Sequence, residues 1–341
     1  MVLLALFLFP LILVTSSLFI NCWQWTLLAL FAVPLLFNRH EMYHRCIRST
    51  LSAFTLLMVV LTGVFAPCEL VVTGDYHLLS TPTPSFAHSH VVIANHQIYT
   101  DWWFIWLLLW WNSQHQHIRI VLKKELLAVP VFGWGMRFFQ FIFLDRKWRK
   151  DQQTLSRSLL QASRCDLPLF LVLFPEGTVI TSDTHERSRQ YASKSLMRPS
   201  VMTKHVLIPK STGLLHCLQS IRSSFNQYLF DLTICYDCDP SQFPYDVLSP
   251  YDTFIRCIGP RRIYIHVNAI PIDTIPGIDA PDTPAFEQWL RDLYVEKDQR
   301  MHSFLSNGAS TADSQSIRFD WNKLDFTHSL AYIIQKLTNV Y

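Results

Sequence analysis

The amino-acid sequence predicts an α/β fold, in which a mixed central sheet is flanked by helices and preceded by N-terminal transmembrane or membrane-embedded helices. Three observations predict it. Residues 1–38 contain no Asp, Glu, Lys or Arg; from Glu69 onward short apolar runs alternate with longer amphipathic ones; and only 16% of the 341 residues are charged, whereas 50% are hydrophobic. A typical soluble domain is about 25% charged, so this composition argues against a freely soluble chain and against a disordered one.

The N-terminal apolar stretch is longer than a single membrane pass needs. As an α-helix, residues 1–38 would extend roughly 57 Å at 1.5 Å per residue, whereas a bilayer core is about 30 Å thick. We therefore expect two passes, broken near Asn21 or Pro34, or one pass with a long interfacial end. A cleaved signal peptide is disfavoured because the positive n-region is missing and the apolar run is too long.

A second uncharged run covers residues 49–68, which is close to the minimum for one span. A buried core helix is the alternative to membrane attachment here. Between the two runs we expect a basic connector on the cytoplasmic side, by the positive-inside rule. It comprises Arg39, His40, Glu41, His44, Arg45 and Arg48.

The remainder of the chain alternates between two kinds of segment. Short β-branched or aromatic runs predict strands at 91–94, 118–122, 139–144, 169–174, 206–209, 229–236 and 262–267. Amphipathic segments predict helices at 151–164, 186–197, 210–224 and 284–306. This alternation is typical of α/β layers. We expect a membrane anchor of one to three hydrophobic helices (1–70), a catalytic domain (71–306), and a polar linker with a short C-terminal amphipathic tail (307–341).

Charge and cysteine content exclude two classes of protein. The 29 Lys and Arg against 26 Asp and Glu give a net charge of +3, without the basic footprint of a nucleic-acid binder. Cys235 and Cys238 form the only close pair among eight cysteines, and a zinc site usually needs a second pair or a His cluster. We therefore expect reduced structural thiols and no metal site.

A His–Asp pair follows the first predicted strand of this α/β region. His96 and Asp101 are five residues apart, so on a straight helix they would lie about 140° from each other. To touch, His96 must lie in the loop or first turn, with Asp101 folding back beneath it. A carboxylate on the far ring nitrogen fixes the tautomer and raises basicity, as a general base toward a hydroxyl requires. Most such pairs are structural, and that alternative stays open for the pair alone.

Three further motifs also follow apolar runs. In Phe174-Pro175-Glu176-Gly177-Thr178 the Pro and Gly force a turn that projects a carboxylate and a hydroxyl from the end of a strand; a plain β-turn is the alternative. Arg146 closes another run and can make bidentate contacts with phosphate. The basic residues that follow it, Lys147, Arg149 and Lys150 around Trp148, suit a solvated face or a contact with anionic headgroups. The fourth motif is Val206-Leu207-Ile208-Pro209-Lys210.

Together these motifs resemble the glycerophospholipid acyltransferase family, which contains the 1-acylglycerol-3-phosphate acyltransferases. The family's ordered blocks HxxxxD, FxxR, EGT and a Pro-containing strand correspond to 96–101, 143–146, 176–178 and 208–209. The segments NHQIYTDWW, LKKEL, FPEGT and IPKSTGL resemble those of the branch that contains lysocardiolipin and lysophosphatidylinositol acyltransferases. The similarity continues in FDLTICY, YIHV and FEQWLRDLYVEKD, so it covers most of the chain from about residue 70 to 306.

The resemblance implies a role for each matched residue. His96 would take the proton from the free glycerol hydroxyl of the acceptor, and Asp101 would orient His96 and stabilise the imidazolium. Arg146, Glu176 and Gly177 would hold the acceptor's glycerol phosphate. The substrate-binding set that we predict is completed by Asn95, Lys123, Thr178 and Pro209.

One position departs from the family pattern. Many members carry Arg directly after EGT, whereas this chain has Val179, so Arg187, Arg189 or Lys123 stay open as replacements. With Arg146 as the one cation placed by motif, we expect a singly charged phosphodiester acceptor to be favoured over a phosphate monoester, which approaches two charges.

The resemblance implies a membrane-bound acyltransferase that moves a fatty acyl group from acyl-CoA to the free hydroxyl of a lysoglycerophospholipid, with a lysophosphatidylinositol-like acceptor favoured. The hydroxyl would attack the thioester directly, and no GxSxG nucleophile motif occurs in the sequence. We expect no cofactor other than acyl-CoA as co-substrate. The expected partners are the lysophospholipid and the lipid bilayer, not nucleic acid. The expected location is an integral membrane position in the endoplasmic reticulum, or alternatively in a mitochondrial membrane.

Three alternatives remain at this stage. The nearest is a lysophosphatidate acyltransferase of phospholipid synthesis. The second is a non-catalytic lipid-binding membrane protein, and the third is a membrane-anchored hydrolase, which would need a nucleophile or metal set. We further expect an aromatic surface to dip into one leaflet beside His96, or alternatively to fill the core. It comprises Trp102, Trp103, Trp106, Trp110 and Trp111.

Overall fold

The computed structural model describes residues 40–80, 89–130, 132–194, 202–222, 227–279, 284–307 and 317–320, together with residues 11 and 15. The passes predicted within residues 1–38 therefore lie almost entirely outside the described residues, and so does the tail 324–341. The four sequence motifs all lie inside them.

A mixed sheet of eight strands forms the centre of the fold, with the order β4-β3-β5-β2-β6-β7-β1-β8. Five neighbouring strands, β4, β3, β5, β2 and β6, are parallel to one another; β7 is antiparallel to β6, and β8 is antiparallel to β1. The strands are β1 (Glu69–Gly74), β2 (His90–Ala94), β3 (Ile118–Lys123), β4 (Ile142–Leu144), β5 (Phe170–Leu173), β6 (Tyr228–Tyr236), β7 (Arg262–Pro271) and β8 (Ile317–Asp320). The mixed α/β class is as the sequence predicts.

The parallel strands explain why the motifs meet. The carboxyl ends of parallel strands lie at one edge of a sheet, where α/β proteins place their sites. The motif residues that begin at Asn95, Asp145 and Phe174 each follow directly on a strand of this parallel group. The sheet therefore delivers all three loops to the same edge.

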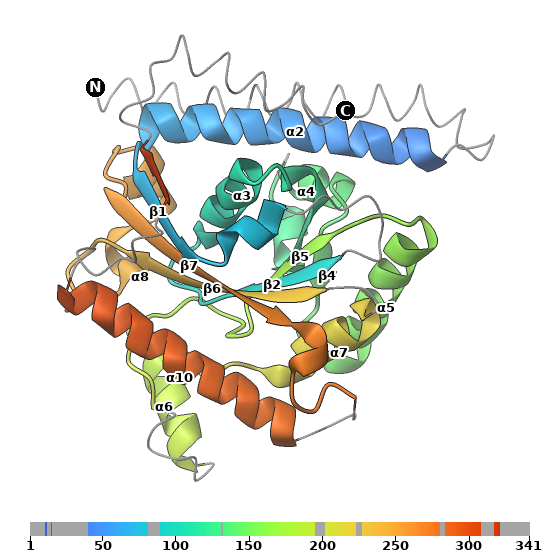
Figure 1. Ribbon diagram of the computed structural model, residues 1–341. Coiled ribbons are helices and arrows are strands. Elements are labelled where there is room, and N and C mark those ends of the chain that lie inside the picture. The colour runs from blue at the N-terminus through green and yellow to red at the C-terminus, as the bar shows by residue number, and fades with distance from the viewer. Residues whose placement is uncertain are drawn as a thin grey trace.

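Helices cover both faces of the sheet (Figure 1). On one side lie α2 (His40–Phe65), α3 (Asp101–Trp111) and α4 (Phe132–Phe138); on the other lie α5 (Trp148–Arg164), α6 (Ser182–Lys194), α7 (Ser211–Ile221) and α10 (Pro284–Asn307). The short helices α8 (Pro244–Val247) and α9 (Pro250–Phe254) follow β6. Each face has its own apolar core, one built around α3 and the other around α5, α7 and α10.

Single-turn 3₁₀ helices occupy several of the connections. They are η1 (Tyr76–Ser80), η3 (His115–His117), η4 (Lys124–Ala128) and η6 (Ile272–Thr274). The segment η4 begins directly at the end of β3, so Lys123 closes that strand at the same sheet edge as the motifs.

One strand prediction is wrong, and two strands of the sheet, β1 and β8, were not predicted. Residues 206–209 form no strand, because Leu207 and Ile208 donate their backbone N–H groups to the side chains of Glu176 and Ser188 instead of to a neighbouring strand. The predicted polar linker contains β8, whose pairing with β1 closes that side of the sheet. The runs predicted at 91–94, 118–122, 169–174, 229–236 and 262–267 are strands, and only the end of 139–144 is one.

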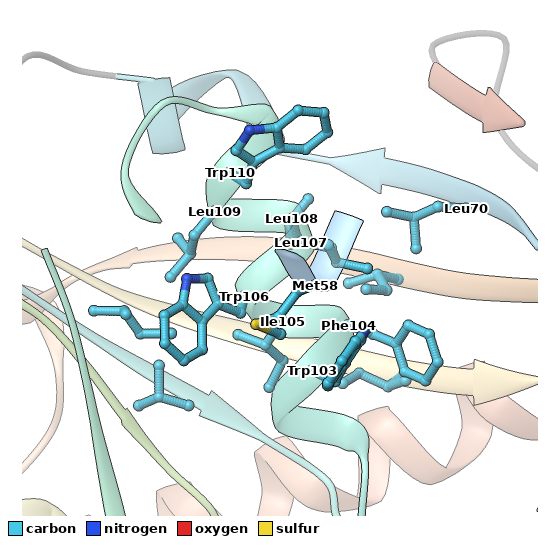
Figure 2. Packing of buried hydrophobic residues seen from close by; sticks show 14 of the residues in the cluster. Met58, Leu70, Trp103, Phe104, Ile105, Trp106, Leu107, Leu108, Leu109 and Trp110 are labelled. Atoms are coloured by element: carbon cyan, nitrogen blue, oxygen red, sulfur yellow. The ribbon is translucent and has the colours of Figure 1, made fainter. Parts of the chain in front are cut away.

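The helix α3 is apolar on all sides because it lies between α2 and the sheet. Trp103, Trp106 and Trp110 are at most 5% exposed. Figure 2 shows these rings with Met58 of α2 and Leu70 of β1 in one packed cluster. The predicted interfacial surface is therefore wrong for these three residues, which fill the core.

The helix α2 is long and apolar enough to cross a membrane over Tyr43–Phe65, but half of this span is buried against the rest of the chain. Trp103 donates its indole N–H to Thr62 at 2.8 Å, and the rings of Phe54 and Trp106 lie 5.4 Å apart. Residues 40–48 of the predicted basic connector are the first turns of this helix rather than a loop, and their position on the cytoplasmic side stays a prediction. The predicted boundary at residue 70 falls inside β1.

Deletion of residues 1–70 is therefore expected to prevent folding rather than to release a lipid-requiring catalytic domain. The deletion removes α2, which packs on α3, and the first residues of β1. Deletion of residues 1–39 is the matched control, since it leaves α2 in place. Limited proteolysis in detergent checks this: the shorter deletion should yield a resistant fragment and the longer one should not. Equal resistance of both would contradict the assignment of α2 to the core.

Candidate active site

His96 and Asp101 meet at the carboxyl end of β2. The strand ends at Ala94, His96 lies in the following loop, and Asp101 is the first residue of α3. The His96 Nδ1 is 2.8 Å from Asp101 Oδ2. The aspartate thus reaches back under the imidazole, as the five-residue spacing predicts.

Asp101 is fully buried and accepts four hydrogen bonds. Besides His96, the backbone N–H groups of Gln97 and Ile98 donate to Oδ2 at 2.6 and 3.1 Å. The hydroxyl of Tyr236, at the end of β6, donates to Oδ1 at 2.5 Å. Four donors around one carboxylate fix its orientation.

Tyr236 is a site residue that the sequence reasoning missed. Burial, reinforced by the Asp101 carboxylate, raises the pKa of the phenol well above its ordinary value, so the hydroxyl remains a donor at neutral pH. The two residues are 135 positions apart in the chain. The sequence does contain one indication of this role. Tyr236 ends an apolar strand of the parallel group, and the end of that strand lies at the same sheet edge as the motifs.

The His96 ring is oriented so that one nitrogen remains for substrate. Because Asp101 accepts from Nδ1–H, the lone pair is on Nε2, for which the described residues show no protein partner. The side chain is 17% exposed and stacks on Phe174, with ring centroids 4.3 Å apart and planes 22° apart. The backbone carbonyl of His96 also accepts from Ile180 N–H at 2.9 Å. This arrangement suits proton abstraction from a substrate hydroxyl.

Glu176 ties three segments of the site together. Its Oε1 accepts the backbone N–H of His96 and its Oε2 accepts that of Leu207, each at 3.2 Å. The side chain is only 3% exposed. Burial raises the pKa of Glu176 well above its ordinary value, while the two backbone N–H groups and the charge of Lys297 act in the opposite direction. The motif is therefore more than a plain β-turn, because its carboxyl group holds the backbone of the His96 loop.

Two cations flank the turn at Gly177, which has a φ of +72°. Arg146, itself at a φ of +59°, donates from Nη2 to the Gly177 carbonyl at 3.3 Å. The Lys210 Nζ lies 3.4 Å from where a Cβ on Gly177 would stand. Gly177, Thr178, Arg146 and Lys210 are all exposed, so this turn presents two positive charges to solvent. Lys210 was not among the predicted binding residues.

The other predicted binding residues occupy different surroundings. Asn95 is fully buried, and its side-chain amide exchanges hydrogen bonds of 2.9 and 2.8 Å with the backbone of Ile234. We therefore assign it a positioning role between β2 and β6 rather than a contact with substrate. Pro209 is buried beside Lys210, whereas Lys123 is exposed at the end of β3 and pairs in register with Leu144, next to Asp145 and the Arg146 loop.

Val179 is only 4% exposed. This changes the argument about acceptor charge that was drawn from the absence of an Arg at this position. Its side chain lies in the interior, so a substituted Arg would have to be buried rather than reach a phosphate at the surface. Because Lys210 supplies a second cation beside Gly177, the expectation of a single cation at this turn is wrong. The preference for a singly charged acceptor needs support from elsewhere.

Cys235 and Cys238 are free thiols, the first buried and the second partly buried. Burial raises the pKa of Cys235 to about 12 and that of Cys238 to about 11, so both stay protonated thiols. In the described ranges no three His, Cys, Asp or Glu side chains are grouped so as to hold a metal ion.

Substitution of Tyr236 by Phe is expected to lower kcat/KM by at least about tenfold. The change removes one hydrogen bond to a charged group, which contributes about 1.5–3 kcal/mol, and leaves the ring in place. The Tyr264→Phe variant is the control, because the Tyr264 hydroxyl accepts a hydrogen bond from Arg262 and not one from a residue of the His96 site. Steady-state kinetics of both variants check the expectation; a Tyr236→Phe rate within twofold of wild type would contradict the role of this hydroxyl.

Comparisons with known proteins identify the family of this chain. The acyltransferase family model matches residues 71–234, and the acyltransferase C-terminus model matches residues 253–323. An uncharacterized acyltransferase of Schizosaccharomyces pombe is 36% identical over 265 residues, which cover 74% of this chain and 73% of the relative.

Two relatives have more specific names. The 2-acyl-1-lysophosphatidylinositol acyltransferase of Saccharomyces cerevisiae is 31% identical over 74% of this chain and 71% of its own length. Lysocardiolipin acyltransferase 1 of Gallus gallus is 30% identical over 74% of this chain and 62% of its own length. The resemblance inferred from the motifs is thereby confirmed: the chain belongs to the glycerophospholipid acyltransferase family.

Proposed function

We propose that this acyltransferase moves a fatty acyl group from acyl-CoA to the free hydroxyl of a membrane lysoglycerophospholipid, with a lysophosphatidylinositol-like acceptor favoured. The observation that carries the proposal is the His96–Asp101 pair, with its remaining ring nitrogen Nε2 directed away from the carboxylate. The same pair, held by Tyr236 and Glu176, is the group in the described site that is arranged to accept a proton.

The reaction follows from these positions. His96 Nε2 accepts the proton of the acceptor hydroxyl as its oxygen attacks the thioester carbonyl, and Asp101 stabilises the imidazolium that forms. The new C–O ester bond replaces the C–S bond, and the imidazolium returns its proton to the departing CoA sulfur. No covalent acyl-enzyme is required, so His96 ends the cycle in its starting state.

The acceptor phosphate is proposed to bind at the Gly177 turn. Arg146 Nη2 already lies 3.3 Å from the Gly177 carbonyl, and Lys210 Nζ lies 3.4 Å from the position that a Cβ on Gly177 would take. Guanidinium groups bind phosphate oxygens in a bidentate manner, and ammonium groups bind them as point charges. A phosphate here would place the glycerol hydroxyl toward the neighbouring His96 loop.

The Arg146→Gln variant is expected to lower kcat/KM for the phospholipid acceptor about 10- to 150-fold. The range corresponds to the loss of one charge-assisted contact of about 1.5–3 kcal/mol. The Arg149→Gln variant removes an exposed charge of the same basic run, in the first turn of α5, and is the matched control. Initial rates over a range of acceptor concentrations measure the effect. An Arg146→Gln variant indistinguishable from Arg149→Gln would rule out this phosphate site.

The preferred acceptor is supported by relatives rather than by charge alone. One relative is named as acting on 2-acyl-1-lysophosphatidylinositol, which agrees with the wording of the motifs. Lysophosphatidate is the second candidate, because Lys210 supplies the additional charge that a phosphate monoester would use.

A side-by-side assay separates the two acceptors. Labelled oleoyl-CoA is supplied to membranes containing the chain, with lysophosphatidylinositol and lysophosphatidate in parallel reactions and with Lys210→Gln as a second enzyme form. The proposal expects a higher kcat/KM for lysophosphatidylinositol. A preference for lysophosphatidate that is lost in Lys210→Gln would identify lysophosphatidate as the acceptor instead.

An integral location in the endoplasmic reticulum membrane remains part of the proposal. It is supported by the charge-free residues 1–38 and by the apolar length of α2. Both substrates carry acyl chains that partition into lipid, so attachment to a bilayer would place the site where they concentrate. Fractionation of cells that express the chain, with alkaline extraction of the membranes, tests it.

A further inference from the structure

An apolar surface is exposed where η4 leads into α4. In the described part of the chain the most exposed large hydrophobic side chain is Trp134 of α4, at 65%. Ala128, Val129 and Pro130, at the end of η4 and directly after it, are exposed as well. Exposed apolar residues that gather in one place mark contacts with a partner, and Trp side chains favour the boundary between water and an apolar phase.

The exposure of Trp134 follows from close packing of the surrounding backbone. Gly133 and Gly135, on either side of it, are buried. The N–H of Gly133 donates to the carbonyl of Val129 at 2.8 Å, and a Cβ on Gly133 would collide with the carbonyl oxygen of Leu127. The glycines thus let α4 lie directly on η4, and the indole between them is directed to solvent by a closely packed support.

The helix α4 also lies next to the start of α2. The Phe139 ring, directly after α4, is 5.5 Å from that of Phe54, and the Gln140 side chain shares a hydrogen bond with Tyr43 in the first turn of α2. Figure 1 shows α4 on the same side of the sheet as α2. Residues 1–38, which precede α2, contain no Asp, Glu, Lys or Arg. A bilayer that takes up this apolar stretch would therefore be close to α4.

Positive charge surrounds the apolar surface. Residues 123–150 contain seven Lys and Arg, all exposed, against two Asp and Glu. Of the two acids, Glu125 is exposed and Asp145 is paired with Lys124 at 2.8 Å. Arg137 is exposed on α4 itself. Clusters of Lys and Arg beside a membrane attract anionic headgroups, so the charge of this region complements the surface of a bilayer that contains anionic lipids.

The same surface extends to the candidate active site. The strand β3 ends at Lys123, and η4 begins at the next residue. Lys124 pairs with Asp145, which directly precedes Arg146 of the proposed phosphate site. A lysophospholipid in a bilayer that lies against η4 and α4 would therefore have its phosphate close to Arg146.

We propose that the exposed residues of η4 and α4 form a bilayer-docking surface, in which Trp134 inserts at the headgroup level and the surrounding cations bind anionic headgroups. This surface comprises Ala128, Val129, Pro130, Trp134 and Arg137. It takes the membrane contact that the buried tryptophans of α3 do not make. The inference rests on the proposed membrane location and not on the acyl-transfer reaction, so its readout is contact with lipid.

The test places a photoreactive residue on this surface in the full-length protein. The residue p-benzoylphenylalanine replaces Trp134 in one variant and Val129 in a second. In the control it replaces Tyr191, which is 54% exposed on α6, on the opposite side of the sheet from α4 (Figure 1). Each variant is reconstituted into vesicles of phosphatidylcholine and phosphatidylinositol with radiolabelled acyl chains and is then illuminated. Thermal unfolding checks that each variant is folded.

Labelled phospholipid should become attached to the variants with the probe at 134 and at 129. The label on the variant with the probe at 191 should not exceed that of a sample kept in the dark. In vesicles of phosphatidylcholine alone the yield at 134 should be lower, because the attraction of the cations to anionic headgroups is lost. An equal yield in the neutral vesicles would overturn the assignment of these cations to anionic headgroups.

The other outcomes count against the docking surface. Equal label at 134, 129 and 191, or no label at 134 and 129 in protein that has entered the vesicles, would overturn the proposal. A crosslink from 134 to residues 1–38 or to a second copy of the chain would assign the surface to that partner instead. Wild-type protein that does not enter the vesicles would contradict the proposed membrane location as well. Absence of acyl transfer with normal labelling would count against the proposed reaction alone.

Discussion

Membranes that contain the His96→Ala variant should show acyl transfer reduced by a factor on the order of 10²–10⁴, which is the usual contribution of a general base. The imidazole is partly exposed, and in the described part of the chain it stacks on Phe174 and pairs with the Asp101 carboxylate. Its backbone contacts with Glu176 and Ile180 do not depend on the side chain. Abundance and thermal unfolding should therefore stay close to wild type.

The control for this variant is His216→Ala. His216 lies on α7, where its Nε2 contacts Ser156 and its ring meets Trp148, in a different core from the His96 loop. It should retain most of the wild-type rate. Residual activity of His96→Ala above a tenth of wild type, at equal protein abundance, would eliminate His96 as the base.

The second large effect is expected from Asp101→Asn, which should reduce the rate by a similar factor of about 10²–10⁴. An amide offers one accepting oxygen and one NH₂ group, whereas Asp101 accepts from four donors on two oxygens. Either the His96 tautomer reverses or the Tyr236 hydroxyl loses its acceptor. Stability should also fall by about 1–3 kcal/mol, the cost of an unpaired buried donor.

The matched control is Asp145→Asn, since Asp145 lies at the same sheet edge and pairs with Lys124 in an exposed position. Exposed pairs contribute about 0–1 kcal/mol, so little change is expected. Single-turnover rates and chemical unfolding of both variants provide the measurement. An Asp101→Asn enzyme that keeps a normal rate despite reduced stability would assign Asp101 to folding alone.

The sequence predicts those features of the fold and site that depend only on local residue pattern and on the direction of the strands. Continuous apolar runs predict buried parallel strands, and because such strands end at one edge, the positions of His96, Arg146 and Glu176 relative to the sheet follow. The spacing of His96 and Asp101 likewise constrains their contact to a loop. These inferences require only periodicity and chain direction.

Partners distant in the chain could not be predicted in this way. Tyr236 meets Asp101 across 135 positions, and Lys297 meets Asp231 across 66. No local sequence pattern indicates either contact, because each side chain is of a type that is common in its strand or helix. Such contacts depend on the register of β6 and on the docking of α10, which only the folded chain defines.

Apolar segments of similar composition can also have different environments in the folded chain, and composition alone does not distinguish them. The Trp-rich segment 102–111 reads as a membrane surface, yet α2 covers it and places Trp106 and Trp110 in the core. Residues 206–209 read as a strand, yet the Glu176 carboxylate takes the N–H of Leu207 that a neighbouring strand would have bonded. In both cases a distant element determines the environment of the segment.

The most direct measurement of the central claim follows the acyl label itself. Labelled oleoyl-CoA is incubated with membranes containing wild-type protein, with and without lysophosphatidylinositol, and both labelled lipids and released CoA are quantified. Acyl transfer predicts label in the diacyl phospholipid, one CoA released per ester formed, and release that depends on the acceptor. Label recovered as free fatty acid, or CoA release unaffected by the acceptor, would contradict it.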